Sequence, residues 1–133
     1  MLVPETMRDW YRQGDTAGVT FMRRFKMLVF SDAVAGQEKA YNEWYTGRHL
    51  DDIVALPGFT GAQRFTIHGA PLGNCSSKYL AIYDMETDDP DAVVAHMFSL
   101  RDTAAMPMSP AFDMASVSVV VCEVFGEAVK ARD

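Results

Sequence analysis

The sequence predicts an α+β fold in which one antiparallel sheet of four strands is covered on one face by two helices. Strand-like and helix-like segments follow one another in the order β-α-β-β-α-β. Each helix-like segment carries its large apolar side chains on one face, as a helix that covers a sheet does. The chain has 133 residues, 49% of them hydrophobic, which is typical of one domain with its own core.

The first strand and the first helix are predicted near the start of this domain. Residues Phe25–Phe30 are rich in strand formers and are followed by a turn signal at Ser31-Asp32. The segment Gln37–Leu56 then repeats large side chains every four positions, as one face of a helix does. These side chains are Tyr41, Tyr45, His49 and Ile53. Pro57-Gly58 ends the helix, because proline has no backbone N–H and glycine tolerates a positive φ.

The second strand is predicted over Phe59–His68, where side chains alternate between two faces. We expect one face to carry Phe59, Gln63, Phe65 and Ile67. The opposite face is expected to carry Thr60, Ala62, Arg64, Thr66 and His68.

The remaining elements follow a turn-rich loop. Tyr79–Tyr83 is apolar on both sides and is therefore predicted to be a central strand. A second helix is predicted to begin at Asp89-Pro90, a carboxylate N-cap followed by proline, and to end near Arg101. Residues 103–116 are predicted to be irregular, and Val117–Phe125 is the last strand.

Together these elements define a ferredoxin-like βαββαβ domain over residues 25–127. An N-terminal extension, 1–24, precedes it, with a short helix expected at Thr6–Gln13, and a C-terminal tail, 128–133, follows. Valines alternate through Val117–Val124, so the last strand is expected to be buried on both faces. Because the helices cover only one face of the sheet, we expect a second copy of the chain to cover the other. The predicted assembly is a homodimer.

The charge balance excludes two classes of partner. The chain has 12 Lys and Arg against 18 Asp and Glu, a formal net charge of −6. Such a chain has no continuous basic field for a phosphate backbone or an anionic membrane surface. We therefore expect no nucleic acid and no membrane as partners. A cytoplasmic location is expected as well, because Trp10, Arg12 and Asp15 interrupt the stretch where a signal peptide would be apolar.

One segment resembles a known family. Tyr45 is followed four residues later by His49, and Leu56-Pro57-Gly58 then precedes a strand that contains Arg64-Phe65. This pattern resembles the EthD-like members of the dimeric α/β barrel superfamily. The resemblance implies a ferredoxin-like protomer, a dimer whose two sheets form a barrel, and a small-molecule pocket between the sheet and the helices of each protomer.

Three residues are candidates for catalysis. A neutral imidazole on the core-facing stripe can accept and return a proton near neutral pH, which favours His49. The resemblance implies the same role, since His49 matches the helix histidine that acts in cofactor-free cyclisation, dehydration, decarboxylation or oxygenation in that superfamily. Tyr45, one turn earlier, is expected to orient His49 or bind a substrate oxygen, and Arg64 to bind a carboxylate or phenolate. The alternatives are a buried structural histidine, a packed core tyrosine and a surface arginine paired with an acidic neighbour.

Further residues are candidates for substrate binding. They are Trp44, Phe65, His68, Tyr83, Met106 and Met108. The two methionines lie in the proline-containing segment before the last strand, where a loop over a pocket is expected. His68 has a solvated strand end as its alternative. We expect no metal and no other cofactor, because the sequence contains no two-histidine i,i+4 pair, no Cys-x-x-Cys and no glycine-rich phosphate loop.

Three functions compete at this point. The first is a cofactor-independent enzyme of the lyase, cyclase/dehydratase or decarboxylase type that acts on a hydrophobic, aromatic or polyketide-like molecule. The second is a monooxygenase of the same superfamily. The third is a non-catalytic module that binds a metabolite, such as a stress-associated protein. In each case the partner is a small hydrophobic or aromatic molecule.

Overall fold

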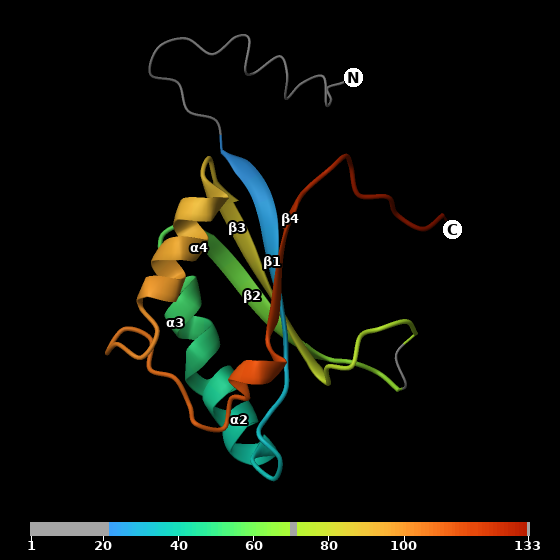
Figure 1. The fold of residues 1–133 in the computed structure, drawn as a ribbon. Coiled ribbons are helices and arrows are strands. Elements are labelled where there is room, and N and C mark those ends of the chain that lie inside the picture. The colour runs from blue at the N-terminus through green and yellow to red at the C-terminus, as the bar shows by residue number, and fades with distance from the viewer. Residues whose placement is uncertain (1–21, 70–71, 133) are drawn as a thin grey trace.

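The computed structural model describes residues 22–69 and 72–132. Its elements in chain order are β1 (Arg23–Ser31), α2 (Glu38–Trp44), η1 (Tyr45–His49), α3 (Leu50–Val54), β2 (Phe59–Thr66), β3 (Tyr79–Thr87), α4 (Pro90–Ser99), η2 (Met114–Ser116) and β4 (Ser118–Glu123). An antiparallel sheet is covered on one face by the helices (Figure 1), which confirms the predicted α+β fold. The short helix expected at Thr6–Gln13 lies outside the described residues.

The four strands lie in the order β2-β3-β1-β4, and all neighbours are antiparallel. β3 therefore has a strand on each side, which confirms its predicted central position. β1 begins at Arg23, and Arg23 and Arg24 pair with Thr87 and Glu86 of β3. The sheet thus includes two residues that the sequence analysis placed in the extension.

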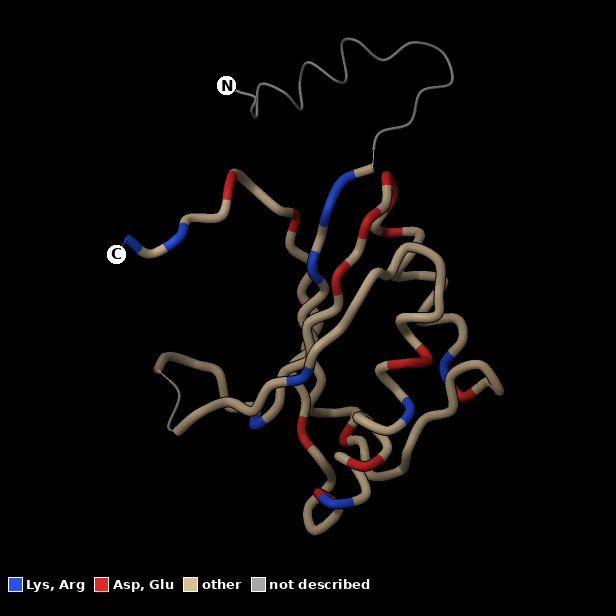
Figure 2. The backbone as a smooth tube through the Cα atoms, turned by 180° about the vertical axis from the view of Figure 1, so that it is seen from behind, with Lys and Arg blue, Asp and Glu red and all other residues tan. Residues whose placement is uncertain are grey.

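Acidic residues of the neighbouring segments lie beside the basic start of β1 (Figure 2). Lys26 forms an ion pair with Asp84 of β3, and Arg23 forms one with Glu123 of β4 at 3.2 Å. These exposed pairs contribute little to stability, in the range of about 0–1 kcal/mol each. They pair two of the three basic residues at the start of β1 with carboxylates.

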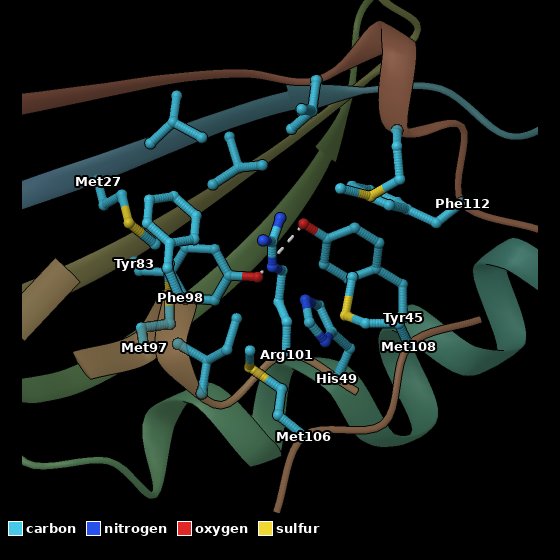
Figure 3. A pocket seen from close by; sticks show the side chains of 15 residues that line it. Met27, Tyr45, His49, Tyr83, Met97, Phe98, Arg101, Met106, Met108 and Phe112 are labelled. Carbon is cyan, nitrogen blue, oxygen red and sulfur yellow. Dashed lines mark hydrogen bonds between the residues drawn. The ribbon is translucent and has the colours of Figure 1, made fainter. Parts of the chain in front are cut away.

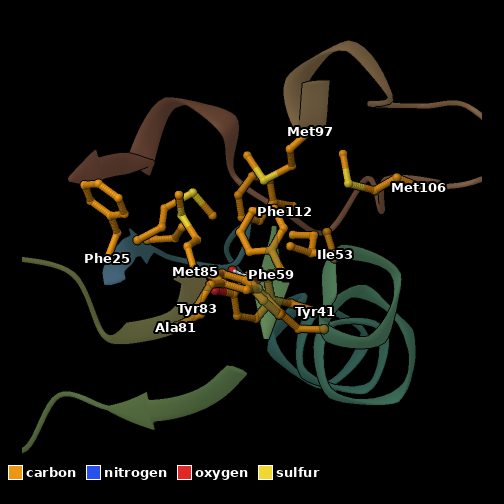
Figure 4. Packing of buried hydrophobic residues seen from close by; sticks show 14 residues of the cluster. Phe25, Tyr41, Ile53, Phe59, Ala81, Tyr83, Met85, Met97, Met106 and Phe112 are labelled. Carbon is orange, nitrogen blue, oxygen red and sulfur yellow. Dashed lines mark hydrogen bonds between the residues drawn. The ribbon is translucent and has the colours of Figure 1, made fainter. Parts of the chain in front are cut away.

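The core lies between the sheet and the helices (Figure 4). Every second residue of β1 from Phe25 to Ser31 is buried, as is every second residue of β3 from Ala81 to Thr87. The helices and the loop before β4 contribute Tyr41, Tyr45, Ile53, Met97, Met106, Ala111 and Phe112. The strand alternation and the helix periodicity therefore bring two apolar faces together.

A π-helical turn interrupts the first helix, which the sequence predicts to be one regular α-helix. In η1 the backbone N–H of Leu50 donates to the carbonyl of Tyr45, five residues earlier. In an α-helix, residues five apart lie about 140° apart around the axis. The wider turn brings Trp44 and His49 together, so that their rings stack with centroids 4.3 Å apart. π-Helical turns of this kind occur frequently at functional sites.

A bulge in β2 changes which side chains share a face. The pairing with β3 shifts between Phe59 and Gly61. The extra residue places Phe59 on the helix-facing side together with Arg64. The predicted face that joins Phe59 with Phe65 is therefore wrong, because Phe65 pairs with Leu80 on the uncovered face and is 38% exposed.

The last strand differs from its prediction as well. β4 is an edge strand, and Val120 and Val121 are 45% and 41% exposed in the single chain. β4 is shorter than the predicted strand Val117–Phe125. The expected burial of its valines on both faces requires a second copy of the chain over the uncovered face of the sheet, and it stays a prediction.

α4 begins where the sequence predicts. Oδ1 of Asp89 accepts a hydrogen bond from the backbone N–H of Ala92 at 3.1 Å, and Pro90 occupies the first turn. The helix ends at Ser99, before the predicted Arg101, and Asp102 then adopts a left-handed conformation with φ of 62°.

Candidate functional site

A cavity of about 220 Å³ lies between the helices and the sheet (Figure 3). Its walls are largely apolar and come from both layers and from the loop before β4. They are formed by Met27, Val29, Tyr45, His49, Ile53, Tyr83, Met97, Phe98, Arg101, Met106, Met108, Phe112, Met114, Val117 and Val119. A largely apolar cavity with a few polar groups is typical of a small-molecule site.

His49 occupies the helix side of this cavity. Its side chain is only 5% exposed, and its imidazole stacks on Trp44 and meets the ring of Tyr45 edge-on at 5.0 Å. Trp44 is itself held by a hydrogen bond from its Nε1 to the carbonyl of Pro107 at 3.1 Å. The π-helical turn and the Trp44 anchor therefore fix the direction of the imidazole.

The electrostatic surroundings of His49 favour its neutral form. Burial lowers the pKa of His49 to about 4, the carboxylate of Asp52 opposes this shift, and the guanidinium of Arg64 adds to it. Nδ1 is buried, and within residues 22–69 and 72–132 it has no hydrogen-bond partner. A buried polar atom without a partner calls for an explanation, and no described residue provides one.

Two tyrosines form the second polar feature of the cavity. The hydroxyl of Tyr83 donates to the hydroxyl of Tyr45 at 3.3 Å (Figure 3). Burial raises the pKa of Tyr45 to about 12 and also raises the pKa of Tyr83. Both hydroxyls therefore remain protonated at neutral pH. Because the hydroxyl of Tyr45 accepts a hydrogen bond from Tyr83, its own O–H can donate a hydrogen bond to a ligand oxygen.

Arg64 lies beside the cavity but not in its lining. Its guanidinium carbon lies 4.4 Å from the ring centroid of Tyr45 and 5.4 Å from that of Tyr41. Its two terminal nitrogens donate to the side-chain oxygens of Asn42 and Thr46 at 2.8 and 2.9 Å. Arg64 thus connects β2 to the first helix and contacts the back of Tyr45.

The other predicted residues fall into two groups. Met106 and Met108 line the cavity together with Tyr83, and Trp44 supports His49 from behind. Phe65 lies on the uncovered face of the sheet, and His68 follows the end of β2 as an exposed residue. The structure therefore does not bring Phe65 or His68 to the cavity.

Several lining residues were not singled out from the sequence. Phe112 packs against Tyr41, Trp44 and Tyr45 from the loop before β4. Arg101 follows α4, and Figure 3 shows its side chain pointing into the cavity. Phe112 lies in an irregular segment and Arg101 lies just beyond a helix, and at neither position does periodicity give a signal that the side chain reaches a cavity.

Two further observations concern the described part of the chain. Within it, no group of three His, Cys, Asp or Glu side chains is placed to hold a metal ion. None of its helices combines the length and the apolar character that crossing a membrane requires.

Comparison with known proteins gives one structural likeness. No family model matches the chain, and no curated protein matches it. The chain is similar to the crystal structure of an ethyl tert-butyl ether D (EthD) family protein from Bacillus halodurans, with 17% identity over 80% of this chain and 99% of that one. The TM-score is 0.47. This likeness is too low to assign a ligand or an activity, and the function below is argued from the cavity.

Proposed function

We propose that this protein is a cofactor-independent enzyme that acts on a small aromatic molecule, with His49 as its general base. The observation that supports the proposal most is the placement of His49. Its imidazole is buried against an apolar cavity, and no described residue bonds to its Nδ1. A purely structural histidine is expected to have such a partner.

The chemistry follows from the protonation states of the cavity groups. With its pKa lowered to about 4, His49 is neutral at pH 7 and can accept a proton from a bound molecule. The hydroxyl of Tyr45, protonated at this pH, can donate to a carbonyl or phenol oxygen on the same molecule. Removal of a proton next to a polarised carbonyl is the common step of cyclisation, dehydration and related lyase reactions.

Arg64 has an indirect part in this proposal. Its guanidinium lies against the ring of Tyr45 and donates hydrogen bonds to Thr46 and Asn42 of the first helix. Arg64 therefore positions the helix face that carries Tyr45 and His49, and it does not contact the ligand. The substrate-contacting candidates are Tyr83, Met106 and Met108, whose side chains share the cavity with His49.

The size of the cavity limits the ligand. A 150 Å³ engineered cavity in a protein core holds benzene. At about 220 Å³, this cavity has room for one substituted aromatic ring. Met106 and Met108 suit such a ligand, since thioethers adapt to irregular shapes and contact aromatic rings favourably.

A ligand-binding protein without catalytic activity is the second candidate. The lowered pKa of His49, about 4, favours it, because a general base works best with a pKa near the working pH. In this case His49 acts as a neutral hydrogen-bonding group for the ligand.

We further propose that the protein is a homodimer that closes through the uncovered face of the sheet. That face carries Leu28, Phe30, Phe65, Leu80, Ile82 and Val120. These large apolar side chains are half-buried or exposed in the single chain, whereas interfaces of obligate dimers resemble a divided core. Light scattering at micromolar concentration should give the mass of a dimer. The mass of a monomer would contradict the proposal.

The experiment that tests the enzymatic proposal has two stages. A thermal-shift screen of phenols, benzoates and aromatic ketones first identifies ligands, since a compound at 100 times its Kd adds about 2.7 kcal/mol of apparent stability. Each ligand is then incubated with wild type and with His49→Gln, and product is followed by mass spectrometry. Turnover by wild type that His49→Gln lacks supports the enzyme. Binding without turnover in wild type supports the ligand-binding protein instead.

A further inference from the structure

We infer that the ligand of this cavity is an aromatic carboxylate, whose carboxylate group binds Arg101 at the mouth while its ring enters toward His49. The inference rests on the proposed function and specifies its substrate class. Arg101 was not among the residues that the sequence singled out, and nothing in the comparisons assigns it a role.

Arg101 lies where the cavity meets the surface of the protein. Its side chain lines the cavity and also lines an adjoining outer groove of about 620 Å³. The residue is exposed, whereas His49 is buried, so the two mark the outer and inner ends of the same space. Figure 3 shows the guanidinium of Arg101 pointing inward from this outer end. A charged group on a ligand bound there can keep partial contact with water.

The positive charge of Arg101 indicates which chemical group of a ligand binds there. In the described part of the chain, Arg101 forms no ion pair, and its guanidinium lies 5.9 Å from the ring centroid of Phe98. The neighbouring Asp102 lines the outer groove but not the cavity. At the mouth of the cavity the guanidinium is therefore a cation without a paired carboxylate among the described residues, in a protein whose formal net charge is −6. A carboxylate matches its planar geometry with two parallel hydrogen bonds.

The backbone at Arg101 is also held in place. Asp102 takes a positive φ of 62°, and its N–H donates to the carbonyl of Met106 at 3.0 Å. A bridge joins Arg101 to Met106 and a second one joins Thr103 to Met106. A non-glycine residue in this conformation is uncommon, and such residues cluster at ligand sites. The short loop thus fixes the base of the Arg101 side chain and links it to the cavity wall.

The positions of Arg101 and His49 at the two ends of the cavity determine the orientation of the ligand. With its carboxylate at Arg101, a single aromatic ring directs its far substituent toward His49 and the Tyr45 hydroxyl. A hydroxyl or carbonyl at that far position can accept from Tyr45, and a hydroxyl can also donate to His49. The cavity therefore favours a ring that is anionic at one end and polar at the other.

The test compares two probes of nearly equal shape, 4-hydroxybenzoate and 4-hydroxybenzamide. Their affinities are measured by isothermal titration calorimetry with the full chain at pH 7.5 and low salt. The carboxylate should bind wild type about tenfold more tightly than the amide, as expected for a charge-assisted pair at a partly exposed position. Raising the salt concentration should weaken the binding of the carboxylate probe more than the binding of the amide probe.

Three variants make the comparison specific to Arg101. Arg101→Gln should remove the preference for the carboxylate, while Arg101→Lys, which keeps the charge, should retain part of it. Arg24→Gln is the matched control, since Arg24 is exposed in β1 and outside the cavity, and it should leave both affinities unchanged. Melting temperatures close to that of wild type establish that the variants are folded.

Three results would overturn the inference. Equal affinity of wild type for the two probes would show that Arg101 does not select an anion, and the proposed function would remain standing. An undiminished preference in Arg101→Gln would place the anion elsewhere. If neither probe binds wild type, both this inference and the single-ring ligand of the proposed function are wrong.

Discussion

The first helix packs on the sheet through one row of side chains. The two ends of this row differ in their hydrogen bonding. At one end the hydroxyls of Tyr41 and Ser31 are bonded at 2.6 Å, and the terminal nitrogens of Arg64 donate to Asn42 and Thr46, while its buried Nε has no partner among the described residues. At the other end no described residue bonds to Nδ1 of His49, and a cavity adjoins the imidazole. We call these the Tyr41 end and the His49 end.

In our proposal, one end of this helix face has a structural role and the other end binds the ligand. Buried polar groups with partners contribute to stability, whereas a buried group without a partner costs about 1–3 kcal/mol. Such a cost persists at functional sites, where a ligand provides the missing partner. Substitutions at the two ends should therefore affect different properties.

The largest expected effect is on turnover at the His49 end. His49→Leu removes the proposed general base, which should lower kcat by about 10²- to 10⁴-fold on a ligand identified as a substrate. Its free energy of unfolding at pH 7 should be unchanged or higher, because an apolar side chain replaces an unpartnered polar one. Kinetics and urea unfolding on the same preparation check both. A folded variant with normal turnover would contradict the catalytic role.

At the Tyr41 end the expected effect is on stability. Arg64→Met loses two hydrogen bonds and the contacts with three tyrosine rings, which should lower the free energy of unfolding by about 2–4 kcal/mol. Arg64→Lys keeps the charge and should lose less. Urea unfolding measures both variants. If Arg64→Met unfolds like wild type, Arg64 does not hold the helix to the sheet.

A third prediction uses pH to separate the two ends. The pKa of His49 is about 4 in the folded chain and near 6.5 when unfolded, so between these values the unfolded state binds more protons. Stability should therefore fall by up to about 3 kcal/mol as the pH drops from 6.5 to 4. His49→Gln should lack this component, and the difference between the two pH profiles isolates it from the carboxylates. Parallel profiles would show that the pKa of His49 is not lowered.

The smallest expected effect concerns the tyrosine pair. Tyr83→Phe removes the donor to Tyr45 from a fully buried position and should lower the free energy of unfolding by about 1 kcal/mol. Tyr79→Phe is the comparison, because the hydroxyl of Tyr79 donates to Glu38 at an exposed site and accepts from Asn42 at 3.3 Å at a half-buried one, where water can replace the lost bonds and the effect should be smaller. Thermal unfolding of both variants provides the comparison. A smaller loss in Tyr83→Phe than in Tyr79→Phe would show that the buried pair is not stabilising.

The sequence predicts the row of core-facing side chains on the first helix but not which of them adjoin the cavity. The spacing of Tyr41, Tyr45, His49 and Ile53 predicts one helix face toward the core, and all four are buried. The π-helical turn that stacks Trp44 on His49 depends on packing with the loop before β4 and has no local signal. Periodicity therefore locates the site on the helix but not the direction of its side chains.

Features without a local sequence signal also explain why the prediction for Phe65 is wrong and why Arg101 and Phe112 were missed. One extra residue near Gly61 reverses the alternation of β2, so that Phe65 leaves the helix-facing side. Arg101 and Phe112 reach the cavity from segments far along the chain, and only tertiary contacts bring them to His49. Element order, in contrast, follows from local patterns, which is why the fold class could be predicted.

The central claim is that His49 is a neutral imidazole that meets the ligand in the cavity. A nitrogen-15 NMR titration of its ring, assigned with His49→Gln and recorded with and without 4-hydroxybenzoate, tests this claim most directly. We predict that the pKa of His49 is about 4 and that saturating ligand shifts its ring nitrogen signals. A pKa near 6.5 in the free protein, or ring signals that do not respond to a ligand whose binding calorimetry has established, would contradict the account.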